Sequence, residues 1–410
     1  MFDPHAATET LLGALPAAAR LKAVHYTQGG HWLLLWSWLV GVLASVIIAR
    51  AAVLPRVRDR IERRRGRPWL AAFGVAVVFF VVDSVLELPW EAYAHWWREK
   101  SYGLTSQPFV GWLGEGLIGL VIGLLVFGVF FMILYALVRR APRTWWLWAA
   151  AAAAALQVIG MIAAPVLIEP IFNHYTPAPP GPTRDAVVAL AEKAGVPSDR
   201  IYIYNGSKQS NRYTANVSGL FGSARVAMSD EMFAKGADIA EVRGVVGHEM
   251  GHYKRHHVLI GTAFLTLLAL AVFFLVDRLF PVVNRWVGTG AAALADPVGL
   301  PALMIVLSTL LVIATPIQES FSRWEESDAD AFSLRVANEP DGMARALVKT
   351  IEYRADSPSA LEEFLFYDHP SVRRRVQRAM DWKAAHLALA RRQEAADGVV
   401  GAPGESAPAS

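Results

Sequence analysis

Six segments of this chain are apolar for long enough to cross a lipid bilayer, and this feature limits the possible folds more than any other. A membrane-spanning helix needs about 20 predominantly apolar residues. The segments cover residues 32–53, 69–90, 109–138, 145–168, 258–279 and 298–317. Several carry tryptophan at one end, as helices anchored at a membrane interface do. A single segment of this kind also suits a buried core helix, but six together predict a polytopic integral membrane protein.

The composition agrees with this interpretation. Charged residues make up only 18% of the 410 residues, below the roughly 25% of soluble globular domains. The net charge is +3 and the arginine clusters flank apolar segments, so we expect no nucleic-acid partner. The absence of cysteine excludes disulfide bonds and thiolate metal sites. Residues 1–26 lack a basic start followed by a clean apolar core, so we expect no cleavable signal peptide.

Two long polar stretches are predicted to form a small catalytic domain. In the first, residues 183–194 and 239–256 have helical periodicity, whereas 200–204 and 224–228 predict strands. The second is predicted to be helical, with breaks at two prolines, Pro340 and Pro370. The predicted parts are an N-terminal transmembrane domain with about four spans (1–168), a catalytic domain (169–257), two further transmembrane helices (258–317), a helical part of the catalytic domain (318–392) and a disordered tail (393–410).

The first polar stretch contains the metal-binding pattern His-Glu-x-x-His. Side chains four residues apart lie on one face of a helix, so His248 and His252 can direct both imidazoles at one ion. Glu249 can then reach a water on that ion, whose pKa zinc lowers to about 7. The alternative is a pair of surface histidines. Gly247 and Gly251 each cost about 1 kcal/mol in a helix interior, which indicates that close packing around the ligands requires them.

The spacing alone leaves the third ligand open. A carboxylate from the acidic cluster after the last apolar segment would complete a His₂Glu site. The candidates are Glu319, Glu325, Glu326, Asp328 and Asp330. A continuous helix would place His256 nearly in line with His248 and His252, which suits a tetrahedral ion poorly. We therefore interpret His256 and His257 as cationic residues near a helix C-terminus.

These motifs resemble the type-I CAAX prenyl protease family of membrane zinc endopeptidases, over about residues 89–375. The sequence VGHEMGHYKRHH resembles the catalytic helix of the family, and FSRWEESDADAF resembles its S-R-x-x-E-x-x-A-D-x-F element. The resemblance implies one zinc ion per chain, bound by His248, His252 and Glu326. It also implies that Asp330 orients one of these ligands through a hydrogen bond.

The sequence YDHPSVRRR resembles the D-x-H-P…R element of the same family. In the family this histidine and arginine face the scissile carbonyl, and the resemblance assigns that role to His369 and Arg375. Electrostatic stabilisation of this kind is commonly the largest catalytic term. The alternatives are a turn histidine held by Pro370 and a solvated helix charge.

The chain departs from the family in two places. The family usually has N-A-Y-x-x-G on an edge strand that is thought to hold the substrate backbone, whereas this chain has NRYTANVSG. Aligning the two patterns on Gly219 puts Thr214 where asparagine is expected. Thr214 and Asn216 are therefore the candidate substrate contacts. The substrate would bind as an extended peptide that pairs with a sheet edge. The family also typically has seven spans, and the missing one lies before Trp69.

Short loops rich in arginine predict the orientation in the membrane. Seven arginines lie between residues 55 and 68, and Arg139, Arg140 and Arg143 lie in a second short loop. The positive-inside rule places both loops in the cytoplasm. Counting the spans onward then places residues 169–257 on the opposite side, whereas the family resemblance implies a cytosolic catalytic domain. The charges of this long stretch do not decide, because long loops translocate largely regardless of charge.

The fold class predicted from these features is mainly α, a polytopic transmembrane helical bundle with a small α/β zincin-like catalytic domain. The predicted function is a membrane-embedded zinc endopeptidase that hydrolyses membrane-associated, misfolded or prenylated CAAX-type proteins. Its partners would be a protein or peptide substrate and the lipid bilayer, which is the inner membrane in a bacterium. The alternative is a non-catalytic membrane protein, such as a transporter or a pseudoprotease scaffold. Glu249 argues against it, because a metal-binding scaffold needs no base there.

Overall fold

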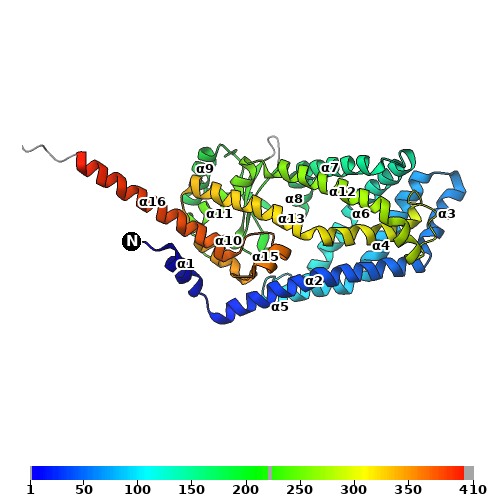
Figure 1. Ribbon diagram of the computed structural model, residues 1–410, viewed down its shortest axis with the longest axis horizontal. Coiled ribbons are helices and arrows are strands. Elements are labelled where there is room, and N and C mark those ends of the chain that lie inside the picture. Colours follow the sequence, from blue (N-terminus) through cyan, green and yellow to red (C-terminus); the bar gives the residue numbers. More distant parts are fainter. Residues whose placement is uncertain (1, 220–223, 401–410) are drawn as a thin grey trace, which may run out of the picture.

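The computed structural model describes residues 2–219 and 224–400. The molecule is elongated, with a bundle of long helices at one end and a domain built around a small sheet at the other (Figure 1). The α-helices are α1 (Pro4–Gly13), α2 (Ala17–Arg50), α3 (Val53–Arg65), α4 (Pro68–Glu91), α5 (Arg98–Ser101), α6 (Phe109–Arg140), α7 (Trp145–Ala163), α8 (Glu169–Phe172), α9 (Pro182–Ala194), α10 (Asp230–Ala234), α11 (Ile239–Lys254), α12 (His257–Val287), α13 (Leu300–Ala337), α14 (Pro340–Lys349), α15 (Ala360–Phe366) and α16 (Val372–Val400). The short turns are η1 (Ala92–Trp97), η2 (Ala164–Ile168), η3 (Gly206–Lys208), η4 (Pro297–Gly299) and η5 (Thr350–Glu352).

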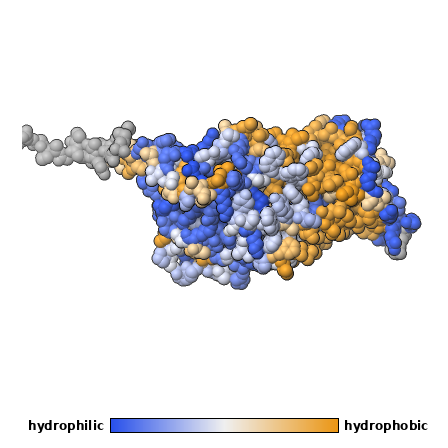
Figure 2. Space-filling view, turned by 90° about the horizontal axis from the view of Figure 1, so that it is seen from below, coloured by the Kyte–Doolittle hydropathy of each residue, from blue (hydrophilic) through white to orange (hydrophobic). Residues whose placement is uncertain are grey.

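Six helices in the described ranges are long and apolar enough to cross a membrane, in agreement with the six predicted segments. They are α2, α4 continued through η1 and α5, α6, α7 continued through η2 and α8, α12, and α13 with the preceding η4. Figure 2 shows a broad hydrophobic band over this part of the molecule, with hydrophilic surface at both ends. The band covers the helices whose outward side chains are apolar, as lipid contact requires.

Small residues let the helices of the bundle approach closely. Ala72 and Ala76 of α4 and Ala149 of α7 are completely buried in its core, together with larger side chains such as Phe79. At Gly128 of α6 an added Cβ would lie 2.7 Å from the ring of Phe73. Such contacts provide the packing that holds helices together in lipid, where the hydrophobic effect does not.

The predicted catalytic domain contains a four-stranded sheet with strand order β1-β2-β4-β3. The strands are β1 (Tyr175–Pro177), β2 (Ile201–Tyr204), β3 (Ala215–Ser218) and β4 (Arg225–Ser229). Strands β2 and β4 are parallel, and the two outer strands run antiparallel to their neighbours. The helices α9 and α11 pack on the apolar face of this sheet, around residues such as Val226, Met228 and Met250. Both predicted strands and both predicted helices of this stretch are therefore present.

The prediction of a continuous helix from residue 239 to 256 was wrong at its end. Helix α11 ends at Lys254, and His256 adopts a left-handed conformation with φ 58°. A left-handed residue reverses the chain direction locally, so α12 begins at His257 with a different axis. This break brings the side chain of His257 back toward the preceding helix.

Helix α13 connects the membrane bundle to the predicted catalytic domain without a break. It contains 38 residues, so the predicted domain boundary between residues 317 and 318 falls inside one helix. Pro316 is accommodated within it, and the hydroxyl of Ser320 donates a hydrogen bond to the Pro316 carbonyl at 2.7 Å. Since most side chains that follow favour a helix, the change from apolar to polar residues marks the end of the bilayer and not the end of the helix.

The predicted breaks near Pro340 and Pro370 are present, and η5 and the residues after it add a further interruption. Helix α16 runs to Val400, so the prediction of a disordered tail from residue 393 began too early. The residues at 393–396, Gln-Glu-Ala-Ala, are good helix formers and extend the helix. Residues 401–410 lie outside the described ranges.

The first helix packs against the end of the chain. Leu12 of α1 lies in one apolar cluster with Val376 and Met380 of α16. The N-terminal part of α2 contacts the segment after η5, because Arg20 forms an ion pair with Asp356 at 2.7 Å. Helix α2 therefore contacts both the bundle and the predicted catalytic domain.

Candidate active site

Three side chains from two helices bring their ligand atoms together. The Nε2 atoms of His248 and His252 on α11 lie 3.2 Å apart. The carboxylate of Glu326 on α13 lies 3.1 Å from Nε2 of His248 and 3.3 Å from Nε2 of His252. Ligand atoms about 2.0–2.1 Å from one tetrahedral ion are separated by about 3.3 Å. The spacing of the three side chains therefore fits a small divalent ion.

Two further observations agree with a cation at this position. The Oε2 atom of Glu326 is buried and accepts no hydrogen bond within the described ranges. Burial disfavours the charged form of His248, but the carboxylates of Glu326 and Asp330 outweigh it and raise the pKa of His248 to about 10. The surroundings thus favour positive charge between these residues. Of the five acidic candidates, Glu326 is the one that joins the two histidines.

Glycines allow α11 and α13 to approach closely enough for these contacts. A Cβ added at Gly251 would lie 3.0 Å from the Cα of Ala329, and one at Gly247 would lie 2.9 Å from the hydroxyl of Ser333. The hydroxyl of Ser333 also donates a hydrogen bond to the carbonyl of Gly244 at 2.7 Å. The expectation that the two glycines of the motif permit close packing is therefore confirmed.

Asp330 lies where it can orient His248. Its Oδ1 is 2.9 Å from Nδ1 of His248, and the side chain of Asp330 is fully buried. With its Nδ1–H donating to Asp330, His248 keeps Nε2 free as a metal ligand. Arg375 donates to both oxygens of the same carboxylate, at 2.8 Å and 2.6 Å. This bidentate contact fixes the plane of the carboxylate.

A second chain of contacts orients His252, and sequence reasoning missed it. The Nδ1 atoms of His252 and His257 lie 3.1 Å apart, and Nε2 of His257 lies 3.2 Å from Oδ2 of Asp328. If Asp328 accepts the Nε2–H of His257, then Nδ1 of His257 can accept the Nδ1–H of His252. The Nε2 of His252 is then free for metal. These contacts depend on the left-handed backbone conformation of the residue before His257, which no sequence pattern reveals.

Glu249 lines a small cleft of about 150 Å³ beside the three ligands. Burial raises the pKa of its carboxyl, while the neighbouring His248 and His252 partly oppose this shift. A carboxylate with a raised pKa accepts a proton more readily near neutral pH. The position and the protonation behaviour of Glu249 therefore suit proton transfer next to the ligands.

His369 and Arg375 both line this cleft, but their donors are not equally available. Nε2 of His369 lies 3.2 Å from Oε2 of Glu326, and its Nδ1 lies 2.8 Å from Asp368. Burial and the adjacent Arg354 lower the pKa of His369, which favours the neutral imidazole. Arg375 is buried, and its contacts with Asp330 engage Nε and Nη2, so only Nη1 is left for a substrate.

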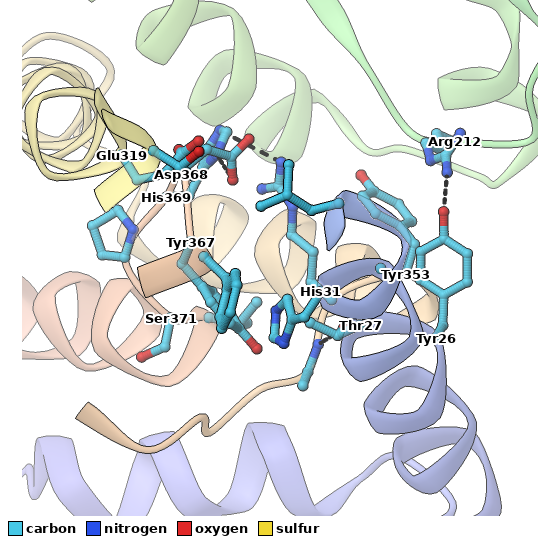
Figure 3. Close-up of a pocket in the computed structure, with 18 of the residues that line it drawn as sticks. Tyr26, Thr27, His31, Arg212, Glu319, Tyr353, Tyr367, Asp368, His369 and Ser371 are labelled. Carbon is cyan, nitrogen blue, oxygen red and sulfur yellow. Dashed lines mark hydrogen bonds and ion pairs between the residues drawn. The ribbon is translucent and has the colours of Figure 1, made fainter. Parts of the chain in front are cut away.

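A larger cavity of about 600 Å³ adjoins the cleft, and Thr214, Tyr353, Arg354 and His369 line both. Figure 3 shows side chains of α2 on one side of this cavity and those of the segment around His369 on the other. The labelled α2 residues are Tyr26, Thr27 and His31. Arg354, which sequence reasoning did not single out, lies 3.5 Å from Nε2 of His369 through its Nη2.

Strand β3 is an edge strand and forms one wall of the cleft. Thr214 and Ala215 line the cleft, whereas Asn216 is not among its described lining residues. The amide of Ser229 donates to the carbonyl of Thr214, and Ala215 pairs with Met228. Since pairing alternates along an antiparallel ladder, the backbone of Ala215 faces the free edge, while that of Asn216 faces β4.

Two family profiles together match most of the chain. The profile of peptidase family M48 matches residues 181–383. The profile described as CAAX prenyl protease N-terminal, five membrane helices, matches residues 4–174. Within that second range, four helices of the described residues are long and apolar enough to cross a membrane.

Two relatives and one solved structure resemble the chain over most of its length. An uncharacterized metalloprotease of Bacillus subtilis, YhfN, is 26% identical over 343 residues, which are 81% of this chain and 79% of the relative. CAAX prenyl protease 1 of Saccharomyces cerevisiae is 23% identical over 321 residues, 73% of this chain and 70% of the relative. The crystal structure of S. mikatae Ste24p has a TM-score of 0.74 at 20% identity and covers 89% of both chains, which shows a shared fold.

These matches agree with the arrangement of the site and of the spans. They identify a multi-pass integral membrane protein that acts as a metalloprotease on protein or peptide substrates. They do not favour a transporter or a pseudoprotease scaffold. The chain belongs to peptidase family M48, within its group of membrane proteases that carry a CAAX prenyl protease N-terminal domain.

Proposed function

We propose that the protein is a zinc-dependent endopeptidase with one zinc ion per chain, bound by His248, His252 and Glu326. The observation that carries the proposal is the close approach of the three side chains. The two Nε2 atoms lie 3.2 Å apart, and the Glu326 carboxylate lies 3.1 Å from His248 through Oε2 and 3.3 Å from His252 through Oε1. Two imidazoles with one carboxylate suit zinc, whereas magnesium and calcium prefer oxygen ligands. When bound, the metal would polarise the scissile carbonyl and acidify the attacking water.

Glu249 is the general base and acid of this proposal. It takes a proton from the attacking water and later donates that proton to the leaving amine. Its place beside His248 on α11 and its raised pKa support both steps, because a carboxyl that titrates closer to neutral pH can accept and release a proton.

His369 and Arg375 are proposed to stabilise the negative charge that develops on the scissile carbonyl oxygen. His369 lines the cleft with Nε2 next to Glu326, and it serves this role in the tautomer or charge state that carries a proton on Nε2, since only a protonated nitrogen can donate to the carbonyl oxygen. Arg375 contributes mainly through position, because its contacts with Asp330 hold the carboxylate that orients His248. Asp330 is in turn proposed to fix the tautomer and the ring orientation of His248.

The substrate is proposed to bind as an extended peptide along the free edge of β3. In this mode the backbone of Ala215 forms hydrogen bonds with the peptide, and the side chain of Thr214 contacts it from the cleft wall. The predicted contact from Asn216 has less support, since its backbone is directed toward β4. We propose that substrates are membrane-associated or misfolded proteins. The name of the yeast relative also supports prenylated CAAX proteins as a candidate class.

The proposed division of the chain follows from the same site. Residues 169–257 supply the histidines and the base, and residues 318–392 supply the carboxylate, His369 and Arg375. We propose that these two stretches form one catalytic domain, joined to the membrane by α12 and α13.

The test is a peptidase assay with purified wild-type protein and the E249Q variant in detergent. We expect about one zinc per chain in both and cleavage of an unstructured peptide by the wild type alone. The matched control is E192Q, on the exposed side of α9, which is expected to cleave as the wild type does. Equal cleavage by E249Q, or the absence of bound metal from wild type and variant alike, would refute the proposal.

A further inference from the structure

One arginine at the junction of the two cavities has no acidic partner. Arg354 lines both the cleft beside the ligands and the larger cavity that adjoins it. Among the residues that the structure describes, its contacts are Nε2 of His369, 3.5 Å from Nη2, and the ring of Tyr353, with the centroid 5.6 Å from Cζ. A separation of 3.5 Å is too long for a strong hydrogen bond, so the donors of this guanidinium remain available.

The other arginines among the described lining residues of these cavities are engaged by neighbouring groups. The pairs are Arg375 with the carboxylate of Asp330, Arg212 with the carboxylate of Glu99, and Arg98 with the carbonyl of Tyr26. A charge in a partly enclosed cleft is costly unless it meets water or an opposite charge. Arg354 is therefore the lining arginine whose charge is left for a group that enters the cleft.

The backbone beside Arg354 is anchored, although its side chain is not. The amide of Ala355 donates to the hydroxyl of Thr27 on α2 at 2.8 Å, and Ala355 is buried. The next residue, Asp356, forms the ion pair with Arg20 of the same helix. These contacts fix where the guanidinium begins its reach into the cleft, and a binding residue needs a support of this kind.

The direction of the substrate places Arg354 on the side of the leaving group. Antiparallel strand pairs are slightly more stable than parallel ones, so we expect the peptide to run opposite to β3. Its C-terminal part then passes the start of β3, next to Thr214, which lines both cavities as Arg354 does. From there the larger cavity extends to the side chains of α2 (Figure 3). Arg354 thus faces the part of the substrate that departs with the new amine.

Arg354 is also close enough to contact residues next to the scissile bond. Its Nη2 lies 3.5 Å from Nε2 of His369, and that nitrogen lies 3.2 Å from Oε2 of the metal ligand Glu326. The two distances together correspond to about two residues of extended chain, at about 3.3 Å each. A group held by the guanidinium therefore belongs to one of the first three residues after the scissile bond.

We propose that Arg354 forms a subsite for a carboxylate of the substrate on the leaving-group side of the scissile bond. A guanidinium presents paired N–H donors that match the two oxygens of a carboxylate. The neighbouring Asp368 does not fill this subsite, because its Oδ1 is engaged 2.8 Å from Nδ1 of His369. An aspartate or glutamate side chain and the free C-terminus of a polypeptide both supply the required group. The position of the scissile bond rests on the proposed function, whereas carboxylate binding is measurable without cleavage.

The test measures the binding of short peptides to the E249Q protein in detergent by fluorescence anisotropy. A single glutamate is moved along a neutral, unstructured peptide, and each peptide is compared with its glutamine counterpart. A second series compares free and amidated C-termini. We expect a carboxylate in the preferred position to tighten binding at least about tenfold, as hydrogen bonds between charged groups do.

Three double variants identify the residue responsible. The preference should fall to about one when R354Q is added to E249Q, and R354E should favour lysine over glutamate at the same position. The matched control adds R335Q, which removes an exposed arginine of α13 outside both cavities, and should keep the preference. Equal binding of all charged and neutral pairs, or a preference that survives R354Q, would overturn the inference. A preference confined to one of the two series identifies the source of the carboxylate.

Cleavage by the wild type separates this subsite from the proposed chemistry. The same preference should appear in kcat/KM, and mass spectrometry of the products should place the preferred carboxylate within three residues after the cleaved bond. A preferred carboxylate before that bond would refute the placement. If the peptides bind with the expected preference but none is cleaved, the subsite stands and the proposed function fails. If all are cleaved and bound without preference, the proposed function stands and the subsite fails.

Discussion

The contact between α11 and α13 at Gly251 offers a sharp test of how the site is assembled. In the substitution G251A the new Cβ would lie 3.0 Å from the Cα and 3.2 Å from the carbonyl oxygen of Ala329. Carbon atoms in ordinary contact are about 3.5–4.0 Å apart. Because the crowded atoms belong to the backbone of Ala329, no rotamer change relieves the contact, and the helices must separate by about 0.5–1 Å.

Two effects of similar size oppose each other in the stability of this variant. Alanine favours the helix interior over glycine by about 1 kcal/mol, whereas overpacking a tight contact costs about 1–3 kcal/mol. The net destabilisation is therefore about 0–2 kcal/mol. The metal site is less tolerant, because functional groups must stay within about 0.5 Å of their productive positions. Gly251 adjoins His252, and Ala329 lies one turn after Glu326, so the separation falls between the ligands.

We therefore expect G251A to bind zinc at least about tenfold more weakly, out of proportion to its small change in unfolding temperature. Competition with a calibrated chelator measures the affinity, and thermal unfolding of the metal-free protein in detergent measures the stability. The control is G119A in α6, where an added Cβ meets no atom within 4 Å. A G251A variant with wild-type zinc affinity would refute the argument that this glycine sets the distance between the ligands.

Two further predictions concern the contacts of the site, and a third concerns the N-terminal cap of α11. D330N and D328N should each weaken zinc binding by about 10–100-fold without abolishing it. Chelator competition measures the affinity, and a wild-type value for either variant would contradict this prediction. Zinc present at 100 times its dissociation constant should stabilise the protein by about 2.7 kcal/mol, so chelation should lower the unfolding temperature of the wild type but not of E326Q. The carboxylate of Asp238 caps α11 by accepting a hydrogen bond from the Glu241 amide at 2.8 Å. D238A removes this cap and should lower the free energy of unfolding by about 1 kcal/mol, whereas D238N should retain most of it. The Glu241 amide and Arg345 lower the pKa of Asp238, so its ionised form stabilises the fold above about pH 4 and this contribution is lost as the pH falls further. A D238N variant with the same acid sensitivity as the wild type would contradict that assignment.

The membrane helices and the ligand pair were predictable because each depends on a local pattern. A run of apolar residues is sufficient to predict a span, and the four-residue spacing of His248 and His252 is sufficient to place two imidazoles on one helix face. The third ligand could not be chosen among the five acidic residues from a local sequence pattern. It depends on the register between α11 and α13, which the close contacts at Gly247 and Gly251 set. Only the family resemblance selected Glu326 before the structure did.

His257 shows where the local pattern fails. Its distance along the chain from His252 suggests another exposed cation, but the left-handed residue His256 turns it inward until it is almost fully buried. The cost of that backbone conformation is of order 1–2 kcal/mol for a residue other than glycine. Packing of α12 and the contacts of His257 with His252 and Asp328 offset it. A sequence contains no local signal for a conformation that tertiary contacts impose.

The two helices that carry the ligands are also the ones that enter the membrane. Helix α11 leads directly into α12, and α13 runs unbroken from the bundle to Glu326. The register between these helices is therefore set both by glycine contacts in the catalytic domain and by packing in the bundle, where α12 and α13 are neighbours. A change that shifts α12 against α13 inside the bilayer must shift the ligands as well, because no flexible linker separates them. The metal site is for this reason mechanically part of the membrane domain, although every ligand lies outside its apolar segments.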